Sequence, residues 1–156
     1  MKELKTDNNN IKYAIACDQA AFQLKLEVIS HLKEKGIDFI DFGTHSTDPV
    51  SYPEYAHKAC EAIQKGLCDR AILICGTGLG MSMTANKHKG IRAACVSDTF
   101  SAKMSRVHND ANCLCFGARV VGKGLAFEIV DAFIETDFEG GRHQPRIDLM
   151  MSYEKI

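Results

Sequence analysis

A cysteine followed by closely spaced glycines is the part of this 156-residue sequence best suited to catalysis. The segment RAILICGTGLGMSMTANK runs from Arg70 to Lys87, so an apolar strand leads into Cys75 and a helical pattern follows. A thiol just before a helix lies near unpaired backbone N–H groups and the positive end of the helix dipole, which both favour the thiolate. The amides of residues 76–80 could also hold a developing oxyanion. Cys75 is therefore a candidate base.

Two other interpretations of this loop have less support. Gly76 and Gly78 fit the first two glycines of a dinucleotide-binding GxGxxG motif, but Met81 stands in place of the third. Asp98 does lie near where a ribose-binding acid would be expected, so a nucleotide-binding module stays an alternative. A plain strand-to-helix turn accounts for the glycines through positive φ, but not for the polar residues that converge on them.

Two arginines could bind an anion, and one histidine could donate a proton. Arg142 and Arg146 flank the expected start of a final helix near Pro145. Two guanidinium forks beside helix N–H groups bind a phosphate dianion well, although such arginines are also common on solvated surfaces. The imidazole of His108 suits acid–base chemistry near neutral pH, but a lone loop histidine more often has no such role.

Composition narrows the class of protein. Nineteen Lys and Arg residues against twenty Asp and Glu residues give a formal net charge of -1, so no general positive field would attract nucleic acid or an anionic membrane. The seven cysteines show neither a CxxC pair nor zinc-ligand spacing. Most of them are expected to be small core or near-core residues in a reducing compartment, namely Cys60, Cys68, Cys95, Cys113 and Cys115. The start is polar and no run is long enough to span a bilayer, so we expect a cytoplasmic protein.

Short apolar runs alternate with longer amphipathic runs, which is typical of βαβ units and a parallel sheet. We expect strands over residues 12–17, 37–43, 70–75, 91–97 and 112–117. Helices are expected over residues 20–36, 53–65, 80–90, 98–110 and 122–136, with a last one beginning near residue 145. This order predicts an α/β fold, a three-layer α/β/α sandwich with a Rossmann-like, five-stranded parallel sheet. Residues 1–11 are expected to form a flexible N-terminal extension and residues 12–156 a single domain.

In such a sheet the ligand sits outside the carboxyl ends of the strands. Four segments follow the ends of predicted strands, namely residues 17–18, 43–52, 75–80 and 97–98. We therefore expect these segments to lie around a common rim.

Five separated segments together point to one family. They are ACDQAAFQLK, DFGTHSTDPVSYPEYA, ILICGTGLGMSMTANKHKGIRAA, SRVHNDANCLCFGARVVG and EGGRHQPR, in this order. From about Lys12 to the C-terminus, the chain closely resembles the type B ribose-5-phosphate isomerases and the related galactose-6-phosphate isomerase subunits. The resemblance implies an aldose–ketose isomerase that works through a cis-enediolate without a metal or organic cofactor. Ribose 5-phosphate and ribulose 5-phosphate are the expected pair, and a hexose 6-phosphate of allose or galactose is the alternative.

Within this resemblance, the glycine loop carries the reaction. Cys75 corresponds to the base that moves a proton between carbons 1 and 2 of the sugar. The backbone at Gly76, Gly78 and Gly80 corresponds to the anion hole for the enediolate oxygen. Thr77 would hold a sugar hydroxyl and help to move protons.

Other matched residues would hold the sugar. His108 corresponds to the histidine that opens the furanose ring, with Asp18 and Asn109 holding sugar oxygens nearby. Tyr52 corresponds to a tyrosine that lines the pocket. Because a ring-opening acid is present, a pentose or hexose phosphate is a more natural substrate than an open-chain tetrose phosphate. The presence of both Cys75 and His108 argues against a catalytically silent sugar-phosphate binding protein.

The phosphate end of the site departs from the family at one position. Arg142 and Arg146 correspond to the pair that grips the phosphate. Family members often carry CDH after the first strand, with the histidine assigned to phosphate binding, but this chain has CDQ. Gln19 can donate a hydrogen bond but cannot become cationic. We therefore expect the two arginines to bind most of the phosphate, or the sugar length or phosphate placement to differ.

The resemblance also implies an assembly. Family members are dimers, often paired into tetramers, with active sites at the dimer interface that draw residues from both chains. The final helix is apolar at Ile147, Leu149, Met150 and Met151 and could dock onto a partner. We expect a homodimer or tetramer that acts on a phosphorylated sugar, with neither nucleic acid nor a membrane as partner.

Overall fold

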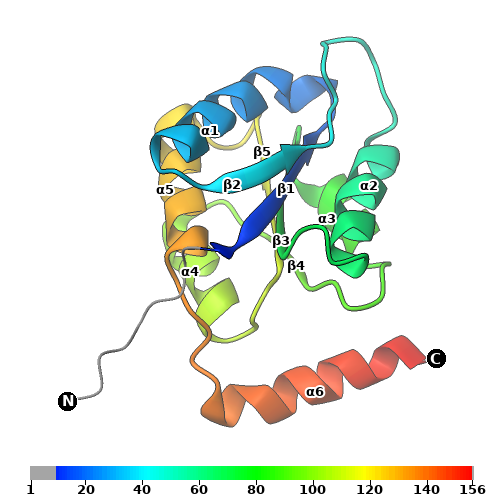
Figure 1. Cartoon of the computed structure of the whole chain (residues 1–156), viewed down its shortest axis with the longest axis vertical. Coiled ribbons are helices and arrows are strands. Elements are labelled where there is room, and N and C mark those ends of the chain that lie inside the picture. The colour runs from blue at the N-terminus through cyan, green and yellow to red at the C-terminus, as the bar shows by residue number, and fades with distance from the viewer. Residues whose placement is uncertain (1–9, 156) are drawn as a thin grey trace.

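The computed structural model describes residues 10–155, which are arranged around a five-stranded parallel sheet (Figure 1). The strands are β1 (Lys12–Cys17), β2 (Asp38–Asp41), β3 (Arg70–Cys75), β4 (Ala93–Cys95) and β5 (Cys113–Gly117). They lie in the order β2-β1-β3-β5-β4, with parallel pairing throughout. The predicted α/β class and parallel sheet are confirmed. The expected N-terminal extension falls mainly on residues 1–9, which lie outside the described residues.

The central strands β1 and β3 are apolar because both faces of the sheet are covered. In β3, Ile72 and Ile74 belong to one core, whereas Leu73 and Cys75 belong to the other, as the alternation of side chains along a strand requires. A parallel sheet covered on both faces favours such continuous apolar runs. The sequence therefore predicts the bounds of these two strands correctly.

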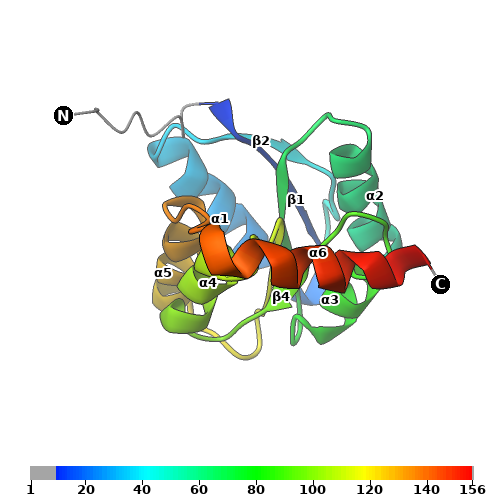
Figure 2. The same cartoon turned by 90° about the horizontal axis from the view of Figure 1, so that it is seen from below.

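Helices form the two outer layers. One face of the sheet carries α1 (Phe22–Glu34), α4 (Thr99–Val107) and α5 (Lys123–Ile134), and the other carries α2 (Tyr52–Gln64) and α3 (Leu79–Ala85) (Figures 1 and 2). Phe116 and Phe133 lie in the first core, and Met81 lies in the second. The 3-10 turns are η2 (Gln19–Ala21), η3 (Gly141–His143) and η4 (Tyr153–Lys155). The predicted three-layer sandwich is confirmed.

The connection between α3 and β4 differs from the prediction. The sequence predicts a helix over residues 80–90 and a strand over residues 91–97, but α3 ends at Ala85 and β4 has three residues. The Asn86 side chain accepts a hydrogen bond from the Ala93 N–H at 2.8 Å and donates one to the Ala93 carbonyl oxygen at 3.0 Å. This pair of bonds closes a turn where helical periodicity alone would continue the helix.

The last helix, α6 (Gln144–Ser152), lies apart from the two helical layers. It runs beneath the sheet in Figure 1 and crosses the molecule when seen from below in Figure 2. Ile147 anchors this helix with 5% exposure, whereas Leu149, at 60%, and Met150, at 44%, are exposed. The helix therefore presents apolar side chains that its own chain leaves uncovered.

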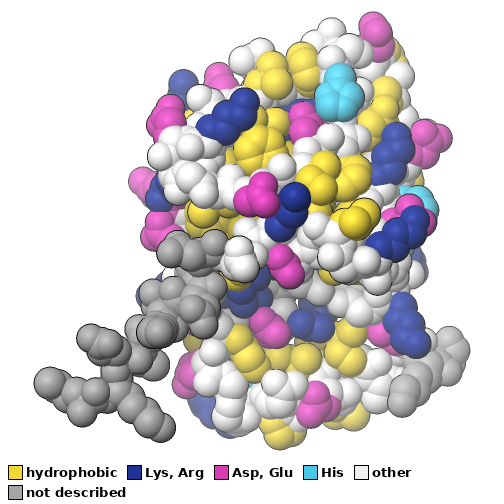
Figure 3. All heavy atoms as spheres, in the orientation of Figure 1, with side chains coloured by type: hydrophobic (Ala, Val, Ile, Leu, Met, Phe, Trp, Pro, Cys, Tyr) yellow, Lys and Arg dark blue, Asp and Glu magenta, His cyan; other side chains and the backbone are white. Residues whose placement is uncertain are grey.

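Charges of both signs are interspersed over the face shown in Figure 3. This mixture fits the formal net charge of -1 and offers a polyanion no extended positive surface on that face. Among the helices within residues 10–155, none is long and apolar enough to cross a membrane.

Candidate active site

The glycine loop folds back over Cys75 at the carboxyl end of β3. Cys75 is 4% exposed, and its Sγ accepts a hydrogen bond from the Gly78 N–H at 3.1 Å. Gly78 has a φ of +81°, and a Cβ atom there would lie 2.8 Å from the backbone of Phe116. Glycine meets both demands because it has no Cβ atom. The loop thus places a backbone donor directly beside the sulfur.

The end of β5 holds this loop in place. The Arg119 N–H donates a hydrogen bond to the Gly76 carbonyl oxygen at 3.0 Å. A Cβ atom at Gly117 would lie 2.5 Å from the Cα of Thr77, so the two segments touch backbone to backbone. Such close contact fixes the direction of the loop amides before any substrate arrives.

Arg119 is a residue near the glycine loop that the sequence-based site does not include. Its Nη1 lies 3.5 Å from the position that a Cβ atom of Gly76 would occupy. Arg119 belongs to the FGARVVG segment, directly after the strand that holds the glycine loop. Its place two residues after Gly117 is the signal that could have identified it, because this segment reaches the carboxyl edge of the sheet.

Asp18 and the loop after β2 reach the same rim. The Asp18 N–H donates to the carbonyl oxygen of Ile74 in β3 at 3.3 Å, and the Asp18 carboxylate accepts a hydrogen bond from the Ala20 N–H at 3.0 Å. The Cys17 N–H donates to the Gly43 carbonyl oxygen at 2.7 Å, which joins the end of β1 to the loop after β2. The ends of β1, β2 and β3 therefore meet at one rim, which brings together three of the four predicted segments.

Tyr52 and Gln19 complete this rim. A Cβ atom at Gly80 would lie 2.6 Å from Cε2 of Tyr52, so the tyrosine ring lies against the glycine loop. Oε1 of Gln19 accepts a hydrogen bond from the Val50 N–H at 3.1 Å. The predicted residues at the carboxyl ends of the strands are therefore Asp18, Gln19, Tyr52, Cys75, Gly76, Thr77, Gly78 and Gly80.

Most other cysteines differ from Cys75 in their surroundings. Burial raises the pKa of Cys17 to about 12, and burial likewise raises the pKa of Cys60 and of Cys68. These thiols stay protonated near neutral pH, where they pack as small apolar residues. Their surroundings agree with the packing role predicted from the sequence.

Cys95 corrects the prediction that it packs in or near the core. It is exposed, because β4 is a short edge strand and Cys95 is its last residue. Its thiol donates to the carbonyl oxygen of Thr77 at 3.8 Å, and its Sγ would lie 3.0 Å from a Cβ atom at Gly78. Cys95 therefore borders the glycine loop from outside.

The other predicted residues lie together at the opposite end of the sheet, where the strands begin. They are His108, Asn109, Arg142 and Arg146. They line a pocket of about 310 Å³ whose other lining residues are His143, Ile147 and Met150. His108 follows the last residue of α4, Arg142 lies in η3, and Arg146 lies in the first turn of α6. Two guanidinium groups and an imidazole around one pocket are a set of donors suited to a phosphate.

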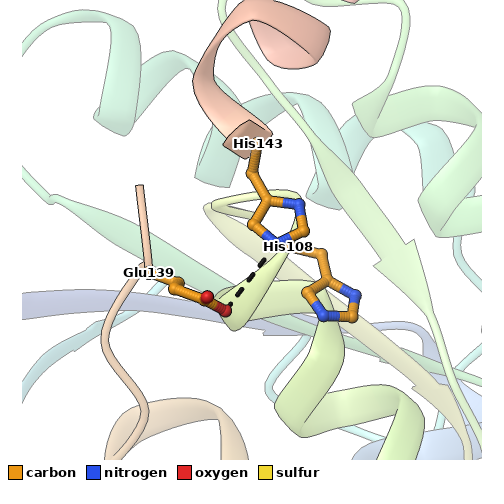
Figure 4. Close-up of side chains that lie close together, drawn as sticks. All are labelled: His108, Glu139 and His143. Carbon is orange, nitrogen blue, oxygen red and sulfur yellow. Dashed lines mark ion pairs between the residues drawn. The ribbon is translucent and has the colours of Figure 1, made fainter. Parts of the chain in front are cut away.

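A second histidine lies against His108 in this pocket (Figure 4). The rings of His108 and His143 stack with their centroids 4.5 Å apart and their planes 23° apart. Nε2 of His143 is buried and finds no hydrogen-bond partner among the described residues, with Oε2 of Glu139 at 3.7 Å. Burial, and then the nearby His108 and Arg142, lower the pKa of His143. His143 is absent from the predicted site, although it lies beside Arg142 in the GGRHQPR segment.

This cluster brings possible metal ligands together, but its geometry suits stacking. Ligand atoms of His108, Glu139 and His143 lie within 4.8 Å of one another. A histidine binds a metal in the plane of its ring, and two nearly parallel rings do not direct their lone pairs at a common point. The Arg142 guanidinium also disfavours a cation here.

The two groups of predicted residues are not brought together within one chain. Cys75 pairs with Gly117 at the carboxyl end of β5, whereas His108 and Asn109 precede Cys113 at its amino end. The strand between these ends alone spans about 13 Å, since each residue advances roughly 3.3 Å. Within one chain, the two groups therefore lie at opposite ends of the strands.

Comparison with known proteins identifies the family. Residues 13–150 match the family described as Ribose/Galactose Isomerase. The chain belongs to this family. The isomerase is 49% identical to ribose-5-phosphate isomerase B of Escherichia coli over 144 residues, which cover 92% of this chain and 97% of the relative.

Solved structures resemble the isomerase over nearly its whole length. Ribose-5-phosphate isomerase B of Clostridium thermocellum matches with a TM-score of 0.91 and 48% identity, over 93% of this chain and 98% of that one. Ribose-5-phosphate isomerase B of Mycoplasma genitalium, solved with bound ribulose 5-phosphate, matches with a TM-score of 0.90 and 40% identity, over 94% and 97% of the two chains. The protein is therefore a sugar-phosphate isomerase, as the resemblance implies.

Proposed function

We propose that this isomerase interconverts ribose 5-phosphate and ribulose 5-phosphate through a cis-enediolate, with Cys75 as the base. The observation that carries the proposal is the Cys75 thiol, buried beneath a glycine loop whose Gly78 N–H donates to the sulfur at 3.1 Å. Relatives named ribose-5-phosphate isomerase B, at nearly half identity, support the choice of substrate.

The reaction moves protons and no other group. The Cys75 thiolate takes the proton from carbon 2 of the open-chain aldose, and the electrons of that C–H bond form the carbon–carbon double bond. The former carbonyl oxygen on carbon 1 carries the negative charge, which the amides of residues 76–80 stabilise. A proton then passes from the oxygen on carbon 2 to the oxygen on carbon 1, with the Thr77 hydroxyl as carrier. The Cys75 thiol gives its proton to carbon 1, which completes the ketose and regenerates the thiolate.

Asp18 and Tyr52 shape the surroundings of this step. The Asp18 carboxylate is held at the rim by the Ala20 N–H, so it can accept a hydrogen bond from a sugar hydroxyl without moving. The Tyr52 ring lies against Gly80 and narrows the access of water to the loop.

In our proposal, a second copy of the chain supplies the ring-opening and phosphate-binding groups. His108 opens the furanose ring by protonating the ring oxygen, while Arg142 and Arg146 hold the phosphate and Asn109 holds a sugar oxygen. All four lie at the amino end of the sheet in their own chain. A two-fold dimer that joins this end to the carboxyl end of the partner's sheet would bring them to the partner's Cys75 and would form two equivalent sites.

Apolar side chains beside the rim support this docking. Leu79 and Met83 of α3 are 52% and 64% exposed, and Phe100 in the first turn of α4 is 71% exposed. Large exposed apolar side chains of this kind gain from burial in an interface. The uncovered apolar side chains of α6 would add to the same interface.

A hexose 6-phosphate of allose or galactose is the second candidate substrate. The observation that favours it is Gln19, an uncharged residue that stands where family members often carry a histidine. Residues 43–51 beside it set the room for one further carbon of the sugar.

An isomerase assay on metal-free protein tests the proposal, with ribose 5-phosphate, allose 6-phosphate and galactose 6-phosphate compared side by side. We expect the highest kcat/KM for ribose 5-phosphate. Cys75→Ala should lower that value by about 10²- to 10⁴-fold, the range of general acid–base catalysis. Cys95→Ala is the matched control, because this exposed thiol borders the same loop from outside, and we expect it to keep most of the activity. An unchanged rate in Cys75→Ala would overturn the base assignment, and faster turnover of a hexose phosphate would overturn the choice of pentose.

A further inference from the structure

The loop between β2 and α2, residues 43–51, forms one wall of the rim, and we call it the rim loop. Its base is held firmly, because the fully buried Lys25 ammonium donates to the Thr44 carbonyl oxygen at 2.7 Å. At its tip, the Asp48 N–H donates to the Ser46 hydroxyl at 3.2 Å, which is a contact within the loop itself. The second half of the rim loop needs another anchor.

Gln19 supplies this anchor. Its Oε1 accepts the hydrogen bond from the Val50 N–H at 3.1 Å. Within residues 10–155, no other hydrogen bond joins residues 46–51 to a segment beyond the rim loop and α2. Gln19 begins η2, directly after Asp18, whose carboxylate caps that turn. The backbone of Gln19 is therefore fixed at the rim before its side chain meets the loop.

Val50, the anchored residue, lies close in the chain to Tyr52, which lines the rim. Val50 precedes Tyr52 by two residues, and Tyr52 is the first residue of α2. The Tyr52 ring lies so close to Gly80 that a Cβ atom there would be 2.6 Å from Cε2. A chain of two residues spans at most about 7 Å, so a shift of Val50 moves Tyr52 relative to the glycine loop.

We propose that Gln19 is a positioning residue that sets the length of sugar phosphate the isomerase accepts. This inference rests on the proposed function above. The Gln19 carboxamide holds the rim loop through the Val50 N–H, and the loop in turn holds Tyr52 against the glycine loop. Its oxygen accepts a hydrogen bond from the protein backbone, and this anchoring role differs from the phosphate binding expected of the family histidine. Loss of the anchor lets the rim loop move outward and favours a hexose 6-phosphate over ribose 5-phosphate.

A double-mutant cycle between Gln19 and Val50 tests this role. Gln19→Leu removes the acceptor, whereas Val50→Pro removes the N–H donor and leaves the Gln19 side chain intact. Val50→Ala keeps the N–H and separates its loss from the loss of the valine side chain. For each variant we would measure kcat/KM for ribose 5-phosphate and for galactose 6-phosphate. Hydrogen exchange of the Val50 N–H, measured without substrate, reports on the anchoring hydrogen bond directly.

We expect each of Gln19→Leu and Val50→Pro to raise the hexose-to-pentose ratio of kcat/KM about fivefold, the effect of one net hydrogen bond. The double variant should show no larger change than either single variant. Exchange of the Val50 N–H should become faster in Gln19→Leu and stay slow in Val50→Ala. Gln19→Glu keeps an oxygen acceptor and should restore the slow exchange.

Direct phosphate binding by Gln19 predicts a different pattern. Gln19→Leu would then raise KM for both substrates, Val50→Pro would leave KM unchanged, and the two effects would add, which overturns the proposal. Unchanged exchange in Gln19→Leu would overturn the anchor whatever the activity. The exchange measurement needs no substrate, so a wild-type protein without isomerase activity would refute the proposed function while the anchor is still decided separately.

Discussion

Single residues of this site matter as much for the side chains they lack as for those they carry. Gly78 and Gly117 leave room for two backbone segments to touch, and this contact brings an amide to the Cys75 sulfur. Burial raises the pKa of Cys17, although a backbone hydrogen bond from Thr44 opposes this rise, and burial also raises the pKa of Cys60. What sets Cys75 apart is its place under the glycine loop at the carboxyl end of β3.

Gly78→Ala should destabilise the protein and reduce its activity together. An alanine at φ +81° adopts an unfavourable conformation, and its Cβ atom would meet the Phe116 backbone at 2.8 Å. We expect a loss of at least about 2 kcal/mol in the free energy of unfolding, measured by urea titration. Gly124→Ala is the matched control, because nothing lies within 4 Å of its Cβ position and it belongs to α5. Equal stability of the two variants would contradict this account.

His143 should make the protein less stable in acid. Burial lowers its pKa in the folded state, whereas the unfolded chain titrates near the ordinary value of about 6.5. As the pH falls through that value, the unfolded state takes up a proton that the folded state resists, so the free energy of unfolding decreases. Urea titrations from about pH 8 to about pH 5 should therefore show a larger loss for the wild type than for His143→Gln. An equal loss in both proteins would remove His143 from the explanation, and His45→Gln, at a 71% exposed side chain, is the control.

At the scale of elements, the sequence predicts best the segments with uniform burial. The bounds of β1 and β3 follow from continuous apolar runs, and the Cys75 loop follows from its place after β3. Contacts between residues far apart in the sequence are different, because no local pattern encodes them. The His108–His143 stack and the Gln19–Val50 hydrogen bond each join segments whose meeting depends on tertiary packing.

The sequence predicts candidate site residues that carry a local signal. It misses residues whose place near the site depends on tertiary packing. Cys75 and its glycines can be identified as candidates from their spacing. The two arginines can be identified from their positions around the expected start of the last helix. Arg119 and His143 lie in matched segments, but their types alone do not separate them from surface residues. The separation of these candidate residues follows from their places along the chain, because Cys75 ends β3 whereas His108 and Asn109 precede β5, and the two strands are parallel.

Lys25 joins α1 to the end of β2, and its loss should weaken that junction. Its ammonium is fully buried and donates to Asp41 at 2.6 Å and to the Thr44 carbonyl oxygen at 2.7 Å. Lys25→Met leaves both acceptors without this donor, so we expect the free energy of unfolding to fall by about 3 kcal/mol in a urea titration. Lys35→Met is the matched control, because Lys35 pairs with acids at the surface and should cost less than about 1 kcal/mol. Similar losses in the two variants would show that burial of the pair does not matter.

At the scale of the whole molecule, the sheet separates the proposed base from the proposed phosphate-binding groups. Cys75 lies at the carboxyl ends of the strands, while His108 and Arg142 lie at their amino ends beside α6. In the proposed mechanism, ring opening, proton transfer and phosphate binding need groups from both ends of the sheet. A dimer in which these ends meet would make the assembly, rather than the chain, the unit of catalysis.

Subunit complementation tests this arrangement. Cys75→Ala and His108→Ala homodimers should each be nearly inactive. In a heterodimer of the two, one shared site combines the intact Cys75 of one chain with the intact His108 of the other, and the second site lacks both. Heterodimers purified through two different affinity tags should therefore show about half of the wild-type kcat, and a random mixture of chains about a quarter.

A site contained in one chain gives the opposite result, because every site in that heterodimer would lack either the cysteine or the histidine. Inactive heterodimers, or sedimentation that shows only monomers, would contradict the shared site. A heterodimer of wild type with Cys75→Ala is the control, since both arrangements leave it one complete site and about half of the activity. Activity of the doubly tagged Cys75→Ala/His108→Ala pair would thus assign the base and the ring-opening acid to different chains.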